Sequence, residues 1–309
     1  MLRPVRAAAR TLFHAWGRAG LAPGWRYRMM ERWGPLLAEP GGLSATLPNG
    51  SRMVCDLTDH VERHVYFLGH YEPIEAFLLT NLLQPRMTVI DGGANVGAHT
   101  LIAATAVGPA GAVHCFEPVP RTADRLEAQV ADNGLDNVKV TRAALWHEAD
   151  VVTLALPPDQ EGNAGAFSLR GGDPVSAIQA PALCLDDYVQ EHAVAHVDFI
   201  KLDLEGAELP ALQGMRGVLE RNRPLLLLEI CRVTCERFDY ETQAIWELLA
   251  GQLGYRGWAV GESSATSHEI DGLQGIDQQN VVFYCGAPPD ALALQWDLKS
   301  VLRWAKSGG

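Results

Sequence analysis

The chain has 309 residues, of which 48% are hydrophobic and 20% are charged, a balance typical of a globular protein that buries a sizeable core. Its length suits one large domain, or one domain with a modest extension. The formal net charge is −12, which argues against a general nucleic-acid binder, because such a protein needs an excess of Lys and Arg to neutralise phosphates.

The six cysteines lie mostly within apolar runs such as AVHCFE and VVFYC, where a thiol behaves as a small buried hydrophobic group. Only Cys231 and Cys235 are close in sequence, and no His or Cys cluster beside them completes a zinc site. No apolar run approaches the roughly 20 residues that span a bilayer. We therefore expect reduced, structural cysteines and a cytoplasmic location.

The first 30 residues differ from the rest of the chain in charge. They contain six arginines and no acidic residue before Glu31. Glycine and proline residues break this segment into short helices, and the later Asn49-Gly50 pair predicts a hairpin. Residues 1–60 are therefore predicted to form a helical extension and a hairpin. The basic face of residues 1–30 is either simply solvated or docks on an anionic surface or a partner.

From residue 61 onward, strand and helix patterns alternate. Buried-strand patterns, namely TVIDGG, AVHCFEP, VKVTRAAL, VDFIKLDLEG and PLLLLEI, are separated by helical patterns. This alternation predicts an α/β fold with a Rossmann-like, doubly wound and mostly parallel sheet over residues 61–288. Residues 150–185 interrupt the alternation with Gly, Pro and short β-like runs, which predict an inserted hairpin and loop. Residues 289–309 are predicted to form a C-terminal helix.

The glycine-rich turn VIDGGANVG, at residues 89–97, is the central motif. In an open α/β sheet, ligands bind at the carboxyl ends of the strands, and glycines there let the backbone approach a ligand. A dinucleotide places its pyrophosphate at the helix that follows, whereas S-adenosylmethionine presents a sulfonium and an ammonium. Asp91 attracts such cations and repels a pyrophosphate. The turn therefore favours S-adenosylmethionine, with Asp91, Gly93, Asn95 and Gly97 as cofactor-binding residues.

Glu117 and Pro118 end the second strand and are also expected to bind the cofactor. An acid at this position accepts hydrogen bonds from ribose hydroxyls, a role that serves NAD and S-adenosylmethionine alike. An NAD-dependent or nucleotide-sugar Rossmann enzyme is therefore an alternative. Short-chain dehydrogenases need a Tyr with a Lys four residues later, and none of the seven tyrosines has one. That observation disfavours one large class of dehydrogenases.

Further acidic residues follow the later strands. Asp203 and Glu205 end the fourth strand and would face the same side of it if the strand stays extended. Neighbouring carboxylates repel each other, so the pKa of one of them is raised above that of the other. The group with the raised pKa is then able to act as a base. Glu205 is alternatively a cap of the helix that follows. Glu229 ends the fifth strand, and Glu72 precedes a helix predicted over residues 73–83, so both are placed to reach the cleft.

Seven ordered blocks of sequence resemble the FkbM family of methyltransferases, over about residues 64–285. They lie at residues 69–73, 91–97, 116–118, 163–169, 185–188, 200–208 and 224–229. The resemblance implies S-adenosylmethionine-dependent O-methylation of a hydroxyl on a sugar or a secondary metabolite. Gly92 departs from the family, which usually has an apolar residue there. This change should loosen the turn slightly without altering its role.

The acceptor site and the adenine site are assigned to segments outside the turn. Ala144, after the third strand, is expected to line the adenine. Residues 159–173 are Gly-rich and polar, and they are predicted to form a mobile lid over the acceptor, with Asn163 facing the cleft. His70 is a further expected acceptor-binding residue.

Methyl transfer is expected to be a direct in-line displacement, assisted by a base that takes the hydroxyl proton. The candidate bases are Asp203, Glu205 and Glu229, with His64 and His70 as less favoured ones. No metal site is evident, although paired carboxylates leave a magnesium-assisted route open. A module that binds S-adenosylmethionine without turnover is the alternative outside enzymology.

Overall fold

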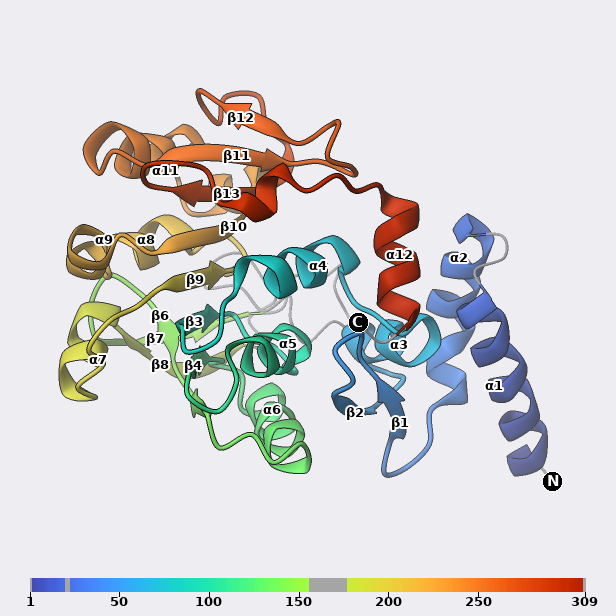
Figure 1. Cartoon of the computed structure of the whole chain (residues 1–309). Coiled ribbons are helices and arrows are strands. Elements are labelled where there is room, and N and C mark those ends of the chain that lie inside the picture. Colours follow the sequence, from blue (N-terminus) through green and yellow to red (C-terminus); the bar gives the residue numbers. More distant parts are fainter. Residues whose placement is uncertain (1, 20–22, 156–176, 308–309) are drawn as a thin grey trace.

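The computed structural model describes residues 2–19, 23–155 and 177–307 of the chain (Figure 1). At its centre is an eight-stranded sheet with the strand order β12-β11-β13-β10-β9-β3-β4-β5. In chain order these strands are β3 (Thr88–Gly92), β4 (Ala112–Phe116), β5 (Val138–Thr141), β9 (Phe199–Leu202), β10 (Leu225–Cys231), β11 (Arg256–Val260), β12 (His268–Ile270) and β13 (Gln278–Tyr284).

The central pairs of this sheet are parallel. β3 pairs with β4 and β9, β4 with β5, and β9 with β10, all in parallel, whereas β13 runs antiparallel to β10 and β11. The predicted Rossmann-like, mostly parallel sheet is therefore confirmed. The short antiparallel edge strand β12 was not among the predicted strands.

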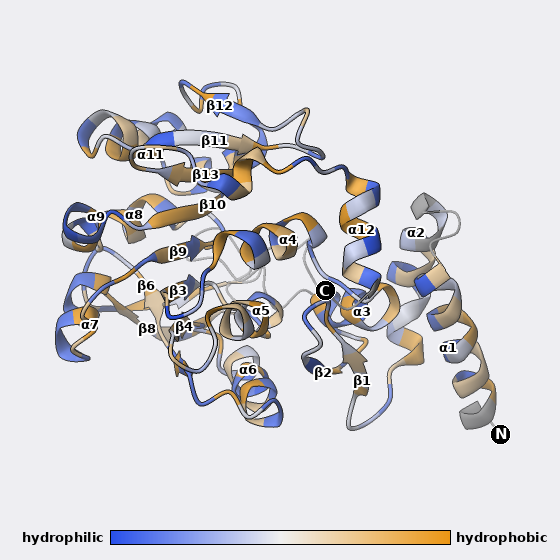
Figure 2. Ribbon diagram, in the orientation of Figure 1, coloured by the Kyte–Doolittle hydropathy of each residue, from blue (hydrophilic) through white to orange (hydrophobic). Residues whose placement is uncertain are grey.

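Alternate residues of the central strands face opposite sides of the sheet. Val89, Phe199 and Leu227 pack in one hydrophobic cluster, and their neighbours Ile90 and Ile200 pack in another on the opposite face. The first cluster also contains residues of α4 (Pro73–Leu82), α5 (Ala98–Val107) and α12 (Leu298–Ser307). The second cluster contains residues of α7 (Leu185–Glu191), α8 (Glu208–Gln213), α9 (Arg216–Asn222) and α11 (Gln243–Trp246). Figure 2 shows hydrophobic residues along α5 and β10, as expected of elements in a covered sheet.

The third predicted strand, VKVTRAAL, is divided between two sheets. β5 ends at Thr141, where the amide of Ala143 donates to the Thr141 carbonyl at 3.0 Å and turns the chain. Arg142 forms ion pairs at 2.6 Å with Asp124 and Glu127 of the neighbouring helix instead of continuing the strand. The chain resumes as β6 (Ala144–Leu145), in a small sheet with β8 (Ile178–Leu183) and β7 (Asp150–Leu154).

β7 and β8 pair antiparallel within the segment for which the sequence predicts an inserted hairpin. Asn163 and the predicted lid over residues 159–173 lie outside the described residues.

The prediction of one helix over residues 289–309 is wrong in its first half. A short 3₁₀ helix covers Asp290–Ala293, and α12 begins only at Leu298. Asp297 sets this start, because its carboxylate accepts from the Ser300 amide at 2.6 Å while its own amide donates to the Ser300 hydroxyl at 3.0 Å. This reciprocal arrangement satisfies amides that the first turn of a helix leaves unpaired.

The structure also contains helices that no sequence pattern predicted. α3 (His60–Leu68) begins at Asp59, whose side chain accepts from the Glu62 amide, and ends at Gly69 in the left-handed conformation with φ +88°. α7 and α10 (Arg232–Arg237) were not predicted either, whereas α11 and the π-helical turn Glu247–Gln252 that continues it lie within the helical pattern ETQAIWELLAGQLG. The helices that were not predicted are short, so their apolar periodicity is hard to detect.

The N-terminal segment contains α1 (Leu2–Ala19), α2 (Pro23–Trp33), a 3₁₀ turn (Gly34–Leu37) and a hairpin of β1 (Leu43–Thr46) and β2 (Arg52–Cys55). Asn49 and Gly50 lie in the hairpin turn, as their sequence predicts. Met30 is fully buried against Phe67 of α3 in the same hydrophobic cluster. Figure 1 shows α1 and α2 packed together on one side of the domain.

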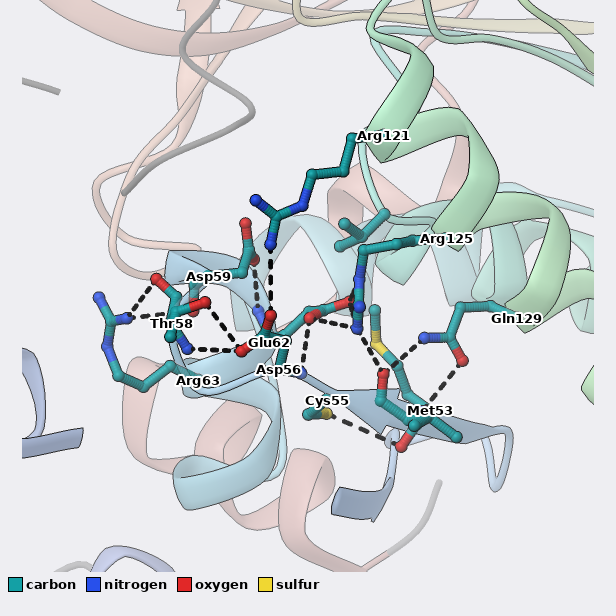
Figure 3. Close-up of polar contacts among 12 residues, drawn as sticks. Met53, Cys55, Asp56, Thr58, Asp59, Glu62, Arg63, Arg121, Arg125 and Gln129 are labelled. Atoms are coloured by element: carbon teal, nitrogen blue, oxygen red, sulfur yellow. Dashed lines mark hydrogen bonds and ion pairs between the residues drawn. The ribbon is translucent and has the colours of Figure 1, made fainter. Parts of the chain in front are cut away.

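A buried ion pair fastens the hairpin and α3 to α6 (Pro120–Asp132), the helix that follows β4 (Figure 3). Both oxygens of Glu62 accept from Arg125 at 2.6 Å, and the Glu62 side chain is fully buried. Arg125 also donates to the Val54 carbonyl at 3.0 Å, and Gln129 both donates to and accepts from the Val54 backbone. Helix α6 is therefore bound directly to the N-terminal segment.

All six cysteines lie among the described residues and are free thiols. Within the part of the chain that the structure covers, no helix is both long and apolar enough to cross a membrane.

Candidate active site

A polar cleft lies where β3, β4, β9 and β10 end, at the edge of the sheet where ligands of such folds bind. Eight of the predicted site residues line it: Glu72, Gly93, Asn95, Glu117, Pro118, Asp203, Glu205 and Glu229. Tyr71, Val119, Leu204 and Gln278 complete the described lining. Five of these side chains are carboxylates, and none of the described lining residues is Lys or Arg. The cleft therefore suits a cationic ligand.

Gly93 brings the turn after β3 against the end of β9. Its φ is +76°, and a Cβ built on it would lie 1.9 Å from the carbonyl oxygen of Asp203. The amides of Gly93 and Ala94 both donate to the Phe116 carbonyl at 3.1 Å, which ties the turn to β4. Gly97, with φ +93°, begins α5, and a Cβ there would meet Leu126. Only glycine fits this close approach of backbone segments.

Asp91 lies beneath the turn and is buried, with 2% of its surface exposed. One carboxylate oxygen accepts from the Thr100 hydroxyl at 2.6 Å, and the other, Oδ1, has no hydrogen-bond partner in the structure. Burial raises the pKa of Asp91 above its usual range. A buried acceptor without a partner is costly, so it marks a place where a ligand or a water molecule would donate.

Glu117 bends back over the turn from the end of β4. Its two oxygens accept from the backbone amides of Asn95 at 2.9 Å and Val119 at 2.8 Å. Burial raises its pKa to about 7, even though both hydrogen bonds favour the ionised form. Each carboxylate oxygen keeps a further lone pair, which a ligand hydroxyl can use.

Lys201 is a charged residue of this region that the sequence analysis missed. It lies in the middle of β9 with 6% of its surface exposed, and its Nζ is 3.3 Å from Asp203 Oδ2. Burial opposes its charge, but Asp203, Asp91 and Glu72 around it hold its pKa above the usual value. Burial also works to raise the pKa of Asp203, and Lys201 outweighs it, so Asp203 has a lowered pKa and is ionised.

Glu229 at the end of β10 lies against Asp203. The negative charge of Asp203, followed by burial, raises the pKa of Glu229 to about 10, and the two carboxyl groups share a hydrogen bond. Gln278 donates to Glu229 Oε1 at 2.7 Å. Glu229 is therefore protonated near neutral pH and donates its proton toward Asp203.

Glu205 does not extend the strand as the sequence predicts. β9 ends at Leu202, and Glu205 has a left-handed backbone with φ +53°, so it and Asp203 are not alternate residues of an extended strand. Its alternative role as a helix cap is not observed, because Ala207 occupies the N-cap position of α8 and no described side chain caps this helix. The Glu208 side chain accepts from the Leu204 amide at 2.7 Å, in the turn that precedes the helix. Burial, with Asp203 and Glu208 nearby, raises the pKa of Glu205 to about 7.

Glu72 joins the cleft from the start of α4. Burial, followed by the charges of Glu75 and Asp203, raises its pKa to about 8. Its Oε2 lies 3.8 Å from His99 Nε2, and burial lowers the pKa of His99 to about 3, so that this ring is neutral. Glu75, one turn further along α4, accepts from Asn280 of β13. No local sequence motif contains Glu75, His99 or Asn280, so the sequence does not predict their place at the site.

Five predicted residues lie outside the described lining. Asp91 is buried beneath the turn. His70 is buried beside Tyr71, and Ala144 is buried in β6. Gly97 contributes to the packing of α5 rather than to the cleft wall, and His64 lies in α3 against Glu31.

The sequence profile described as the methyltransferase FkbM domain matches residues 91–256, more than half of the 309-residue chain. The chain belongs to the FkbM methyltransferase family. The match begins at Asp91 and contains the glycine turn together with Glu117, Asp203 and Glu229. This family match disfavours the alternative of an NAD-dependent or nucleotide-sugar Rossmann enzyme.

Known proteins similar to this FkbM protein are methyltransferases. Hexuronic acid methyltransferase AglP of Haloferax volcanii is 26% identical over 186 residues, which are 60% of this chain and 70% of that protein. Methyltransferase FkbM from Methylobacillus flagellatus has a solved structure with 15% identity and a TM-score of 0.44, over 72% of this chain and 52% of that one. The O-methyltransferase from Bacillus cereus, solved in complex with SAH, has 16% identity and a TM-score of 0.40, over 69% of this chain and 80% of that one. This chain thus spans about half the length of the Methylobacillus protein.

S-adenosylmethionine is the cofactor that membership of the FkbM methyltransferase family implies. The residues present fit this group in three respects. The turn at Gly93 leaves no room for a side chain, Asp91 Oδ1 is a buried acceptor without a partner, and the cleft lining is rich in carboxylates. Each of these features suits a ligand that has hydroxyl donors and a cationic end.

Proposed function

We propose that the FkbM protein is an O-methyltransferase that acts on a hydroxyl of a sugar or a secondary metabolite. The observation that carries this proposal is the cleft lining, with five carboxylates and no Lys or Arg among its described residues. Such a lining attracts a cationic cofactor and provides groups that accept a hydroxyl proton. The similarity to a protein named hexuronic acid methyltransferase supports a sugar acceptor.

The cofactor is assigned to the turn side of the cleft. Glu117 would hold the ribose hydroxyls, with Pro118 beside it, and Asp91 and Asn95 would provide polar contacts next to the glycines at the turn. Glu72 would face the methionine moiety from the start of α4. Ala144 would lie near the adenine. When bound, S-adenosylmethionine supplies an electrophilic methyl group.

Asp203 and Glu205 are assigned different roles because their pKa values differ. Asp203 stays ionised beside Lys201, so it is a weak base and an electrostatic anchor for the cationic end of the cofactor. Glu205, with a pKa of about 7, is the proposed base and takes the acceptor's hydroxyl proton onto a carboxylate oxygen. Glu229 is already protonated near neutral pH, so it is a hydrogen-bond donor to Asp203 and the second candidate base.

The test measures S-adenosylhomocysteine release with panels of neutral sugars, sugar acids and phenolic or aliphatic alcohols. Asp203→Asn is expected to impair cofactor binding and turnover together. Glu205→Gln is expected to keep cofactor binding and to lower turnover by about 10²-fold. Glu236→Gln, at a side chain that is 54% exposed on α10, is the matched control and should change neither.

Two results would contradict this assignment. Full turnover by Glu205→Gln would transfer the base role to Glu229. Tight cofactor binding without product from any hydroxyl compound would favour a non-catalytic binding module.

We also propose that residues 1–30 dock the protein on an anionic lipid surface and take no part in cofactor binding. α1 exposes Val5, Arg6 and Leu12, and α2 exposes Trp25 and Arg28. Exposed apolar side chains among arginines, without an acidic residue in the segment, are typical of helices that lie in a membrane interface.

A further inference from the structure

A second cluster of polar side chains lies where α2 meets α3, outside the lining of the cleft. Glu31 belongs to α2, and His60 and His64 belong to α3. The two histidines are four residues apart, so they lie on one face of the helix, with ring centroids 4.3 Å apart. Glu31 meets both rings: its Oε1 is 3.0 Å from His64 Nε2, and its Oε2 is 3.5 Å from His60 Nδ1.

These separations fit a tetrahedral metal ion. With bonds of about 2.1 Å, the ligand atoms around a tetrahedral zinc ion are about 3.4 Å apart. The separation of 3.0 Å between Glu31 Oε1 and His64 Nε2 is close to this value, whereas the 3.5 Å contact of His60 is to the other carboxylate oxygen. With one ligand atom taken from each of the three residues, the three atoms lie within 4.8 Å of one another. Two imidazoles and one carboxylate are a donor set that zinc accepts in sites with an open fourth position.

Neighbouring groups hold the three donors in this arrangement. Arg63 donates to Glu31 Oε2 at 2.8 Å, which orients the carboxylate and directs Oε1 at His64. The His64 ring is stacked on Tyr71, with centroids 6.2 Å apart and an interplanar angle of 25°. Such supporting contacts orient metal ligands in known sites. The side chains of Glu31 and His60 are 30% and 25% exposed, so an ion has a path from solvent.

We propose that Glu31, His60 and His64 form a binding site for a divalent transition metal such as zinc, with water as the fourth ligand. Two nitrogen donors favour such an ion over magnesium or calcium, which prefer oxygen. The bound ion joins α2 to α3. It also lies beside Tyr71, which lines the cleft and contacts His99 with centroids 6.0 Å apart, so the metal fixes one wall of the cleft.

The experiment uses the full chain without an affinity tag, because a histidine tag would bind the same ions. Metal-depleted protein is titrated with Co²⁺, whose visible absorption bands report tetrahedral coordination, and Zn²⁺ is then added in competition. One Co²⁺ per chain, displaced by one Zn²⁺, is the expected result. His60→Ala should weaken binding by about 100-fold or more, since loss of a ligand exceeds the effect of losing a supporting contact. His268→Ala, at an exposed histidine of β12, should leave binding unchanged.

Glu31→Gln provides a second variant, because it keeps the size of the side chain while removing its charge. It should also weaken Co²⁺ binding, with an unchanged circular dichroism spectrum showing that the protein is folded. Folded wild-type protein that binds no stoichiometric Co²⁺ would overturn the proposal. Equal affinity in His60→Ala and His268→Ala would overturn it as well, because the ion would then bind elsewhere. Both readouts are independent of methyl transfer, so the proposal stands or fails separately from the proposed activity.

Discussion

Replacing Gly93 by alanine tests the construction of the cofactor turn. The φ of Gly93 is +76°, which costs an L-residue about 1–2 kcal/mol. The new Cβ would lie 1.9 Å from the Asp203 carbonyl oxygen, whereas carbon and oxygen atoms in close contact are about 3.3 Å apart. Backbone atoms must therefore separate by about 1.4 Å. That movement breaks the 3.2 Å bond from the Asp203 amide to the Gly92 carbonyl. We expect a total destabilisation of about 3 kcal/mol or more.

Gly134→Ala is the matched control. Gly134 has φ +62°, but a Cβ built there meets no atom within 4 Å, so this variant has the conformational cost without the clash. Urea unfolding followed by circular dichroism should show that Gly134→Ala loses about 1 kcal/mol. Titration calorimetry with S-adenosylhomocysteine should show normal affinity for Gly134→Ala and a strong loss for Gly93→Ala. Equal stability and equal affinity of the two variants would refute the close contact between the turn and β9.

Four further perturbations address the ribose acid, the base, the Glu62–Arg125 ion pair and helix α1, each with its own measurement. Glu117→Ala should weaken S-adenosylmethionine binding by about 1.5–3 kcal/mol in calorimetry, because it removes a charged acceptor; unchanged affinity would exclude the ribose assignment. If Glu205 is the base, turnover should fall as the pH drops below its pKa of about 7, since protonation removes the accepting lone pair; a limb near pH 10 would instead indicate Glu229. Arg125→Met should lower the free energy of unfolding by about 3–5 kcal/mol in urea, because it leaves a buried carboxylate unpaired. Arg142→Met, in exposed ion pairs, should lower the free energy of unfolding much less than Arg125→Met, and similar losses would show that the buried pair contributes little. Leu12→Asp should reduce binding to anionic vesicles without changing cofactor affinity, and undiminished binding would exclude α1 as the docking face.

The sequence predicts best what depends on neighbouring residues. The turn at residues 89–97 and the acid Glu117 are predicted because each directly follows an apolar strand, and a strand of this kind places its carboxyl end at the ligand edge. Glu229 is placed at the cleft by the same reasoning. The five central parallel strands also follow from alternation of apolar runs and helical patterns.

The sequence predicts poorly what depends on distant residues. Asn280 and Glu75 are 205 residues apart, and only the antiparallel return of β13 beside β10 brings them together. The pKa of Asp203 depends on Lys201. A charged residue within an otherwise apolar strand is a sequence signal of a functional role, but no role was predicted for Lys201. The prediction that Glu205 continues the strand beside Asp203 is wrong because the strand ends at Leu202. Nothing in the local sequence pattern marks that end.

The Glu62–Arg125 pair has a consequence for how much of the chain folds as one unit. The family match begins at Asp91, but Arg125 and Gln129 inside the matched region have their partners at residues 54 and 62, before it. A shortened chain starting at residue 91 would leave the Arg125 guanidinium and the Gln129 amide without these partners. The region matched by the family is therefore smaller than the unit that we expect to unfold cooperatively here. The first 90 residues and the sheet should melt in a single transition rather than as separate modules.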